Sequence, residues 1–157
     1  MYQWWLLLHI VGVAGFLTAH GVSMYVLYQV RAVDLDRGRI LGLLTFSGST
    51  TMPMYVSLLL LLAGGVAAGI SGQWFSYWWI WLSILVLLLT TAAMYLVAKP
   101  YFERLKAACE VRPSGVPRVS DEELRQILRG PSTNLVAAIG GVGLLIILYL
   151  MVFKPGV

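Results

Sequence analysis

The sequence predicts an all-α polytopic membrane protein, a bundle of four transmembrane helices with one short cytoplasmic amphipathic helix. Of its 157 residues, 59% are hydrophobic and only 11% are charged, which is unlike a soluble domain. Mean hydropathy is +0.82. Four apolar runs are long enough to cross a bilayer, and none has the alternation typical of a barrel strand. We therefore expect a single integral domain over residues 1–157, in contact with the lipid bilayer.

The first two spans lie in the N-terminal half of the chain. The first is expected over residues 4–30 and, because no basic segment precedes its apolar run, we expect it to be retained rather than cleaved. The next apolar stretch, residues 40–70, exceeds one crossing of about 20 residues. We place its crossing at 51–70, since Pro53 is tolerated in the first turn of a helix. Residues 40–46 would lie at the interface or extend this helix inward.

The third span is expected over residues 77–97, followed by Pro100, and the fourth over residues 134–153. A proline disfavours helical continuation, so we expect the third helix to end before it. The segment between them, residues 98–133, is the one sizeable polar stretch and is expected to form a cytoplasmic loop.

Within this loop the sequence predicts a short helix. Ser120 and Glu123 have the spacing of a capping box, and Gly130 after Arg129 is typical of a helix end. The helix would present an apolar face. That face either docks a partner or packs against the membrane or the bundle.

The distribution of charge predicts the orientation of the chain. Ten of the 11 Lys and Arg residues lie in the connections after the first and third spans, and only Lys154 lies on the other side. The positive-inside rule then places both connections in the cytoplasm and both termini outside. The six tryptophans fall at the outer ends of their spans, as in an interfacial belt: Trp4, Trp5, Trp74, Trp78, Trp79 and Trp81.

We therefore expect a multi-pass protein of the bacterial cytoplasmic (inner) membrane. Its formal net charge of +4 needs no nucleic-acid partner. Orientation during insertion and attraction to anionic lipid account for the positive charge.

Two histidines, His9 and His20, are the only ones in the chain, and both fall in the first span. Their separation is close to three helical turns, so the rings leave an ideal helix on nearly one face, about 16 Å apart along its axis. Titratable side chains are costly in hydrocarbon and are functional-site candidates by default. His9 would lie near the outer surface and His20 near the inner one.

These positions favour heme b and a redox or electron-transfer-linked role. Neutral imidazole is a common iron ligand, and the two levels resemble the stacked hemes of b-type cytochromes. Gly12 and Phe16 would flank the cofactor beside His9 and His20, because a small residue lets a macrocycle or another helix approach closely. Their spacing excludes one iron shared by both histidines. Two arrangements stay open: one histidine per heme with a Met, Lys, Tyr or open sixth position, or a parallel homodimer through the first helix that supplies a second histidine to each heme. The residues predict no catalytic group.

Other interpretations stay open at this point. Both histidines could be structural, hydrogen-bonded across the bundle to a carbonyl or a hydroxyl, in a non-enzymatic accessory subunit of a larger membrane complex; the candidate hydroxyls are Ser57, Ser83, Thr90 and Thr91. The third interpretation is copper binding or transport. His20 and Met24, four residues apart, combine an imidazole with a thioether, which suits Cu(I). Met52 and Met54 flank Pro53 near the inner side. Ion-coupled transport is disfavoured because no predicted span contains an acidic residue.

Several short segments resemble known membrane proteins: Leu8-His9-Ile10, Met52-Pro53-Met54, the Trp-rich start of the third span and the closing Met151-Val152-Phe153-Lys154-Pro155. With them the chain resembles a family of small, uncharacterised four-helix bacterial membrane proteins. It is more distantly similar to HemJ-type protoporphyrinogen oxidases and CopD-type copper-resistance domains. The HemJ resemblance implies heme at His9, which matches the heme-binding histidine of their first helix. Their third helix carries a functionally important lysine where this chain has Ser83, and His20 has no counterpart.

Overall fold

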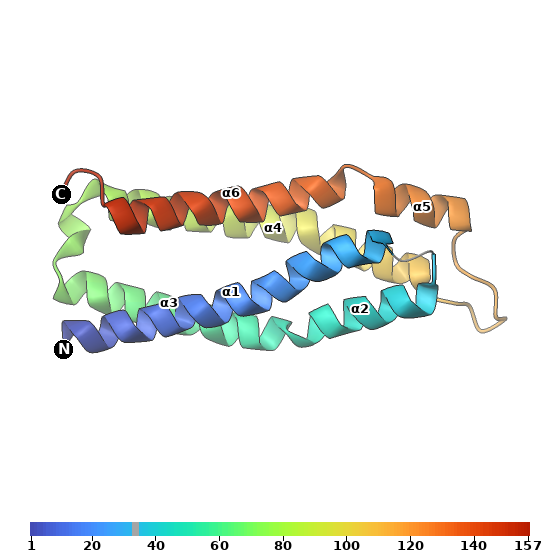
Figure 1. The fold of residues 1–157 in the computed structure, drawn as a ribbon, viewed down its shortest axis with the longest axis horizontal. Helices are drawn as coiled ribbons and strands as arrows, with labels where there is room; N and C mark the ends of the chain where they lie inside the picture. The colour runs from blue at the N-terminus through green and yellow to red at the C-terminus, as the bar shows by residue number, and fades with distance from the viewer. Residues whose placement is uncertain (33–34) are drawn as a thin grey trace.

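The computed structural model of the protein describes residues 1–32 and 35–157. The chain is helical almost throughout (Figure 1), and its elements in order are α1 (Tyr2–Ala32), α2 (Arg37–Ser49), α3 (Thr51–Ser71), the short 3-10 helix η1 (Trp74–Ser76), α4 (Trp78–Cys109), α5 (Asp121–Arg129) and α6 (Ser132–Phe153). Four segments are long and apolar enough to cross a membrane: α1, α2 with α3, α4, and α5 with α6. The predicted all-α fold with four candidate spans is therefore confirmed.

The long helices form two pairs. α1 packs along α3, and α4 packs along α6 (Figure 1). The two pairs are joined mainly at one end, where a large buried core forms from α1, α2, α4, α5 and α6 around Leu27, Ile40, Leu105 and Leu124. A smaller core at the opposite end contains Trp79, Ile80 and Leu150.

Most predicted spans fall within observed helices. Residues 4–30 lie in α1, residues 51–70 in α3 and residues 134–153 in α6. Pro53 lies in the first turn of α3, as expected. Residues 40–46 belong to α2, and α2 is separated from α3 by Thr50 alone, so this stretch extends the second span along the bundle.

The third helix is longer than the sequence predicted. The expected helix stopped before Pro100, whereas α4 continues to Cys109 with this proline inside it. An interior proline costs about 3 kcal/mol, through a lost hydrogen bond and a steric clash. The helix continues because Tyr101 and Leu105 are buried against the large core, and each such side chain contributes about 1.5–3 kcal/mol on burial. The loop predicted over residues 98–133 therefore begins about three helical turns later, after Cys109.

Both termini lie at one end of the bundle (Figure 1). The other end carries the end of α1, the start of α2 and all of α5, and we call it the basic end, because ten of the 11 Lys and Arg residues lie in this part of the helices or in the loop beside it. Lys154 lies at the opposite end, with its Nζ 4.3 Å from the centre of the Trp74 ring. Trp79 departs from the predicted belt. It is only 3% exposed and packs in the smaller core.

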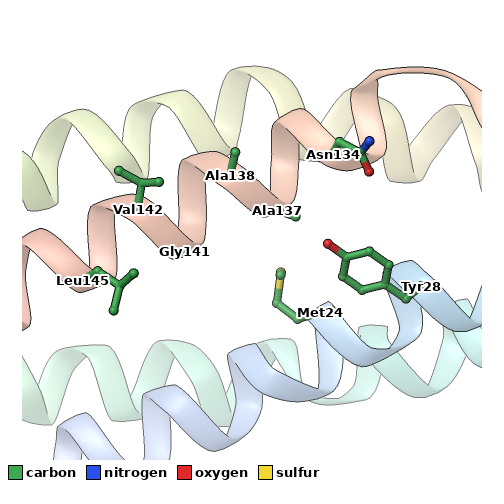
Figure 2. Close-up of a pocket in the computed structure, with 8 residues that line it drawn as sticks. All are labelled: Met24, Tyr28, Asn134, Ala137, Ala138, Gly141, Val142 and Leu145. Carbon is green, nitrogen blue, oxygen red and sulfur yellow. The ribbon is translucent and has the colours of Figure 1, made fainter.

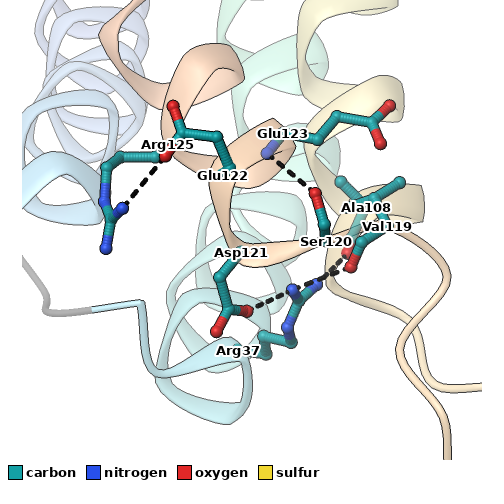
Figure 3. A network of polar contacts seen from close by, with 8 residues as sticks. All are labelled: Arg37, Ala108, Val119, Ser120, Asp121, Glu122, Glu123 and Arg125. Carbon is teal, nitrogen blue, oxygen red and sulfur yellow. Dashed lines mark hydrogen bonds and ion pairs between the residues drawn. The ribbon is translucent and has the colours of Figure 1, made fainter.

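At the basic end, the Arg37 side chain of α2 contacts the end of α4, the loop after it and the start of α5 (Figure 3). Its guanidinium donates to the carbonyl oxygen of Ala108 at 2.6 Å and to that of Val119 at 2.9 Å. It also pairs with the Asp121 carboxylate at 2.7 Å. The start of α2 is thereby bound to the end of α4 and the start of α5.

The helix α5 begins where the capping signal placed it. The Ser120 Oγ accepts a hydrogen bond from the Glu123 N–H at 3.2 Å (Figure 3), and the helix ends at Arg129. Leu124 and Leu128 are buried in the large core. Of the two expectations for its apolar face, packing against the bundle is what the structure has, and this face is not free to dock a partner.

Candidate functional site

His9 is held by a backbone carbonyl of the neighbouring helix. Its Nδ1 lies 2.8 Å from the carbonyl oxygen of Leu61 in α3. Because a carbonyl only accepts, Nδ1 carries the proton, and in a neutral imidazole Nε2 then keeps its lone pair. The ring is half-buried and lies over Gly65, where a Cβ would stand 2.8 Å from Nδ1.

Glycines allow this contact by bringing α1 and α3 together at backbone distance. A Cβ on Gly64 would lie 2.5 Å from the His9 backbone nitrogen, and a Cβ on Gly12 would overlap the backbone of Leu61. Gly64 therefore sets the contact between the two helices. Gly12 was expected beside a cofactor. In the structure it lies against the backbone of α3 at Leu61.

Of the two kinds of partner expected for a structural histidine, His9 has the carbonyl, and the candidate hydroxyls lie elsewhere. Ser83 donates to the carbonyl oxygen of Trp79 in its own helix at 2.8 Å. The Ser57 Oγ lies against Gly15, and Thr90 lies against Gly143. A carbonyl acceptor carries no sequence signal, because every residue has one and only the packing of two helices selects it.

His20 lies in a different environment. Its ring stacks on Phe16, with centroids 5.7 Å apart and planes at 7°. Its Nε2 lies 3.0 Å from the point where a Cβ of Gly140 would stand, and the Sδ of Met94 lies 3.8 Å from the same point. The backbone of α6 therefore covers the tip of this imidazole, and the thioether of Met94 in α4 lies near the same glycine.

The two histidines thus have different neighbours, although their spacing puts them on nearly one face of α1. His9 contacts α3, whereas His20 contacts Phe16 and the backbone of α6. Because α1 crosses its neighbours at an angle, one face of α1 contacts different helices at its two ends (Figure 1). The predicted pair is therefore two separate candidate sites.

A heme fits these two sites unequally. At His20 the α6 backbone occupies the space at Nε2, so a macrocycle does not fit in this arrangement. At His9 the face of the ring toward α3 is covered, but the residue is only half-buried, and Nε2, on the opposite edge of the ring from the bonded Nδ1, has the lone pair that iron requires. His9 is therefore the residue whose chemistry fits heme ligation.

A soft metal ion needs less room than a macrocycle. In residues 1–32 and 35–157, no group of three His, Cys, Asp or Glu side chains could hold a metal ion. Thioethers therefore have to contribute at His20, and Met94 is the one that the structure adds beside Gly140. Met94 could not be predicted as a neighbour of Gly140, because its proximity depends on how α4 and α6 pack. Met52 is 71% exposed on α3.

Comparison with known proteins adds no information about this site. No protein-family model, curated protein or solved structure matches this chain. Ser83 is buried and hydrogen-bonded within α4. The family resemblance remains an expectation that rests on the short sequence segments around His9.

Proposed function

We propose that this chain is a multi-pass membrane protein that binds heme b through the Nε2 of His9 and takes part in electron transfer. The hydrogen bond from His9 Nδ1 to the Leu61 carbonyl is the observation that supports it. Histidines that ligate metals almost always donate their other ring N–H to a carbonyl, carboxylate or water, which fixes the tautomer and the ring orientation. The resemblance of this position to the HemJ-type heme histidine agrees with the proposal.

The heme would complete its coordination outside this single chain. His20 lies about 16 Å further along α1, too far to reach the same iron. A second copy across the first helix, or a subunit of a larger complex, would supply the other axial ligand. Bound heme contributes one-electron redox chemistry. This chain contributes an oriented imidazole on the α1–α3 pair.

The test is an absorption spectrum of the full chain, purified from cells supplied with a heme precursor. A Soret band is expected in the wild type and in His20→Ala, and its loss is expected in His9→Ala. A wild type without a Soret band, or a band that survives His9→Ala, would refute heme binding at His9. If a stoichiometric partner copurifies without any chromophore, the accessory-subunit alternative holds instead.

Copper is a second candidate, favoured by the thioether of Met94 beside His20. Met24, one turn along α1 from His20, adds a second thioether on the same side of that helix. Imidazole with thioethers suits Cu(I). Anaerobic competition against a chromophoric Cu(I) chelator should show binding that weakens in His20→Ala and Met94→Leu and is unchanged in His9→Ala. Equal affinity in all four proteins would exclude this site.

We also infer that the basic end faces the cytoplasm of a bacterial cell and that both termini lie outside. The excess of Lys and Arg in the connections at this end supports that orientation. The indole-rich opposite end agrees with an outer interfacial belt, with the exception of the buried Trp79.

A further inference from the structure

A groove lies between the two helix pairs, near the basic end (Figure 2). Met24 and Tyr28 of α1 form one wall, and residues of α6 from Asn134 to Leu145 form the other. Its volume is about 400 Å³. The α6 wall is thin because Ala137 and Gly141 present almost no side chain, so a ligand can lie close to the helix backbone.

The polarity of the groove changes along its length. At the basic end it has the Tyr28 hydroxyl and the Asn134 amide, and the Arg31 guanidinium donates to the Asn134 Oδ1 at 3.2 Å. Toward the middle of the bundle its wall is apolar, with Val142 and Leu145. Asn134 and Leu145 are separated by about 16 Å along the helix axis. The groove is therefore cationic and polar at the interface and apolar further in.

We propose that this groove binds one anionic phospholipid of the leaflet next to the basic end, with its phosphate at Arg31 and Asn134 and an acyl chain along α6. A phospholipid of that leaflet has the same order of polarity, with its charged head at the interface and its tail toward the midplane. Cationic side chains near an anionic leaflet gain about 1 kcal/mol each from its charge.

The dimensions favour an acyl chain over a helix from a partner. A helix is about 10 Å wide with its side chains, so 16 Å of helix fills on the order of 1,200 Å³. The groove offers about 400 Å³. A single hydrocarbon chain is slender enough to enter it, whereas a second helix is not.

The first test is native mass spectrometry of the full chain in detergent, with equimolar phosphatidylglycerol and phosphatidylcholine. One phosphatidylglycerol adduct is expected to exceed the phosphatidylcholine adduct. Arg31→Ala should reduce the phosphatidylglycerol adduct about fivefold, the factor that corresponds to one lost cation near the surface. Arg39→Ala removes the same charge from an exposed position of α2 and should leave the adduct unchanged. Equal retention of both lipids by the wild type would overturn the proposal.

The second test fills the groove. A Cβ on Gly141 has no atom within 4 Å, and Gly141 lines the groove, so the side chain of Gly141→Leu is expected to enter it. This variant should lose the phosphatidylglycerol adduct. Gly42→Leu is the matched control, since Gly42 in α2 is equally unobstructed and should retain it. Retention of the adduct by Gly141→Leu, or a wild-type homodimer that Gly141→Leu disrupts, would show that the groove takes no lipid.

Discussion

Individual glycines determine how His9 is held. Gly64 lets α3 approach the His9 backbone, and Gly65 lets it approach the imidazole. The bond to the Leu61 carbonyl exists because the two helices are this close. The orientation of the His9 imidazole therefore depends on two glycines whose lack of a side chain lets α3 approach it.

Gly64→Ala should destabilise the protein by about 1–3 kcal/mol, the usual cost of overpacking a tight contact. Its added methyl group would meet the backbone of His9, which has no freedom to move aside. The free energy of unfolding in mixed micelles, followed by circular dichroism, measures the effect. Gly42→Ala is the control, because no atom lies within 4 Å of its Cβ position, and it should be neutral or stabilising by up to about 1 kcal/mol. Equal stability of the two variants would contradict the close contact.

The helices were predictable to different degrees. The spans in α1, α3 and α6 could be predicted from long apolar runs, because a chain that crosses hydrocarbon has few alternatives to a helix. The extension of α4 beyond Pro100 could not be predicted, since the tendency of proline to end a helix is outweighed by the burial of later residues such as Leu105. The capping signal at Ser120 predicted α5 correctly, because that bond is formed within four residues.

Burial of the extended part of α4 can be tested with two leucines of the same helix. Leu105→Ala should cost about 2–5 kcal/mol, since Leu105 is fully buried. Leu88→Ala removes the same atoms at a position that is 62% exposed on the bundle surface, and it should cost much less. Unfolding in mixed micelles compares them. A Leu105 variant as stable as the Leu88 variant would mean that α4 does not pack beyond Pro100.

The contact between α2, α4 and α5 depends on Arg37. Arg37→Ala should destabilise the protein by about 1–3 kcal/mol, because the half-buried carbonyls of Ala108 and Val119 lose their donor. Arg125→Ala breaks an exposed ion pair with Glu122 and should cost at most about 1 kcal/mol. Amide hydrogen exchange should show faster exchange in α5 for the first variant alone. Unchanged exchange there would show that Arg37 does not anchor α5.

At the scale of the whole molecule, the two helix pairs are joined by the large buried core at the basic end. The candidate sites follow from this arrangement: His9 within the α1–α3 contact, and His20 where α1 meets α6. Sequence periodicity placed both histidines correctly on α1. It could not assign their neighbours, since the contacts of Leu61 and Met94 arise only when separate helices pack.

The orientation of the bundle can be measured in a Cys109→Ser background, which removes the single native cysteine. Ser114→Cys lies in the exposed connection at the basic end, and Val157→Cys lies at the C-terminus. A membrane-impermeant maleimide added to spheroplasts should label Val157→Cys and leave Ser114→Cys unlabelled until the membrane is broken, because the positive-inside rule places the basic end in the cytoplasm. The reverse pattern would invert the proposed topology.

Heme ligation by His9 is tested most directly by a dithionite-reduced minus oxidised difference spectrum of the purified full chain. We expect a b-type heme signal in the wild type and in His20→Ala, and none in a folded His9→Ala variant. A folded wild-type protein without this signal, after expression with a heme precursor, would contradict the proposal, as would the same signal persisting in His9→Ala.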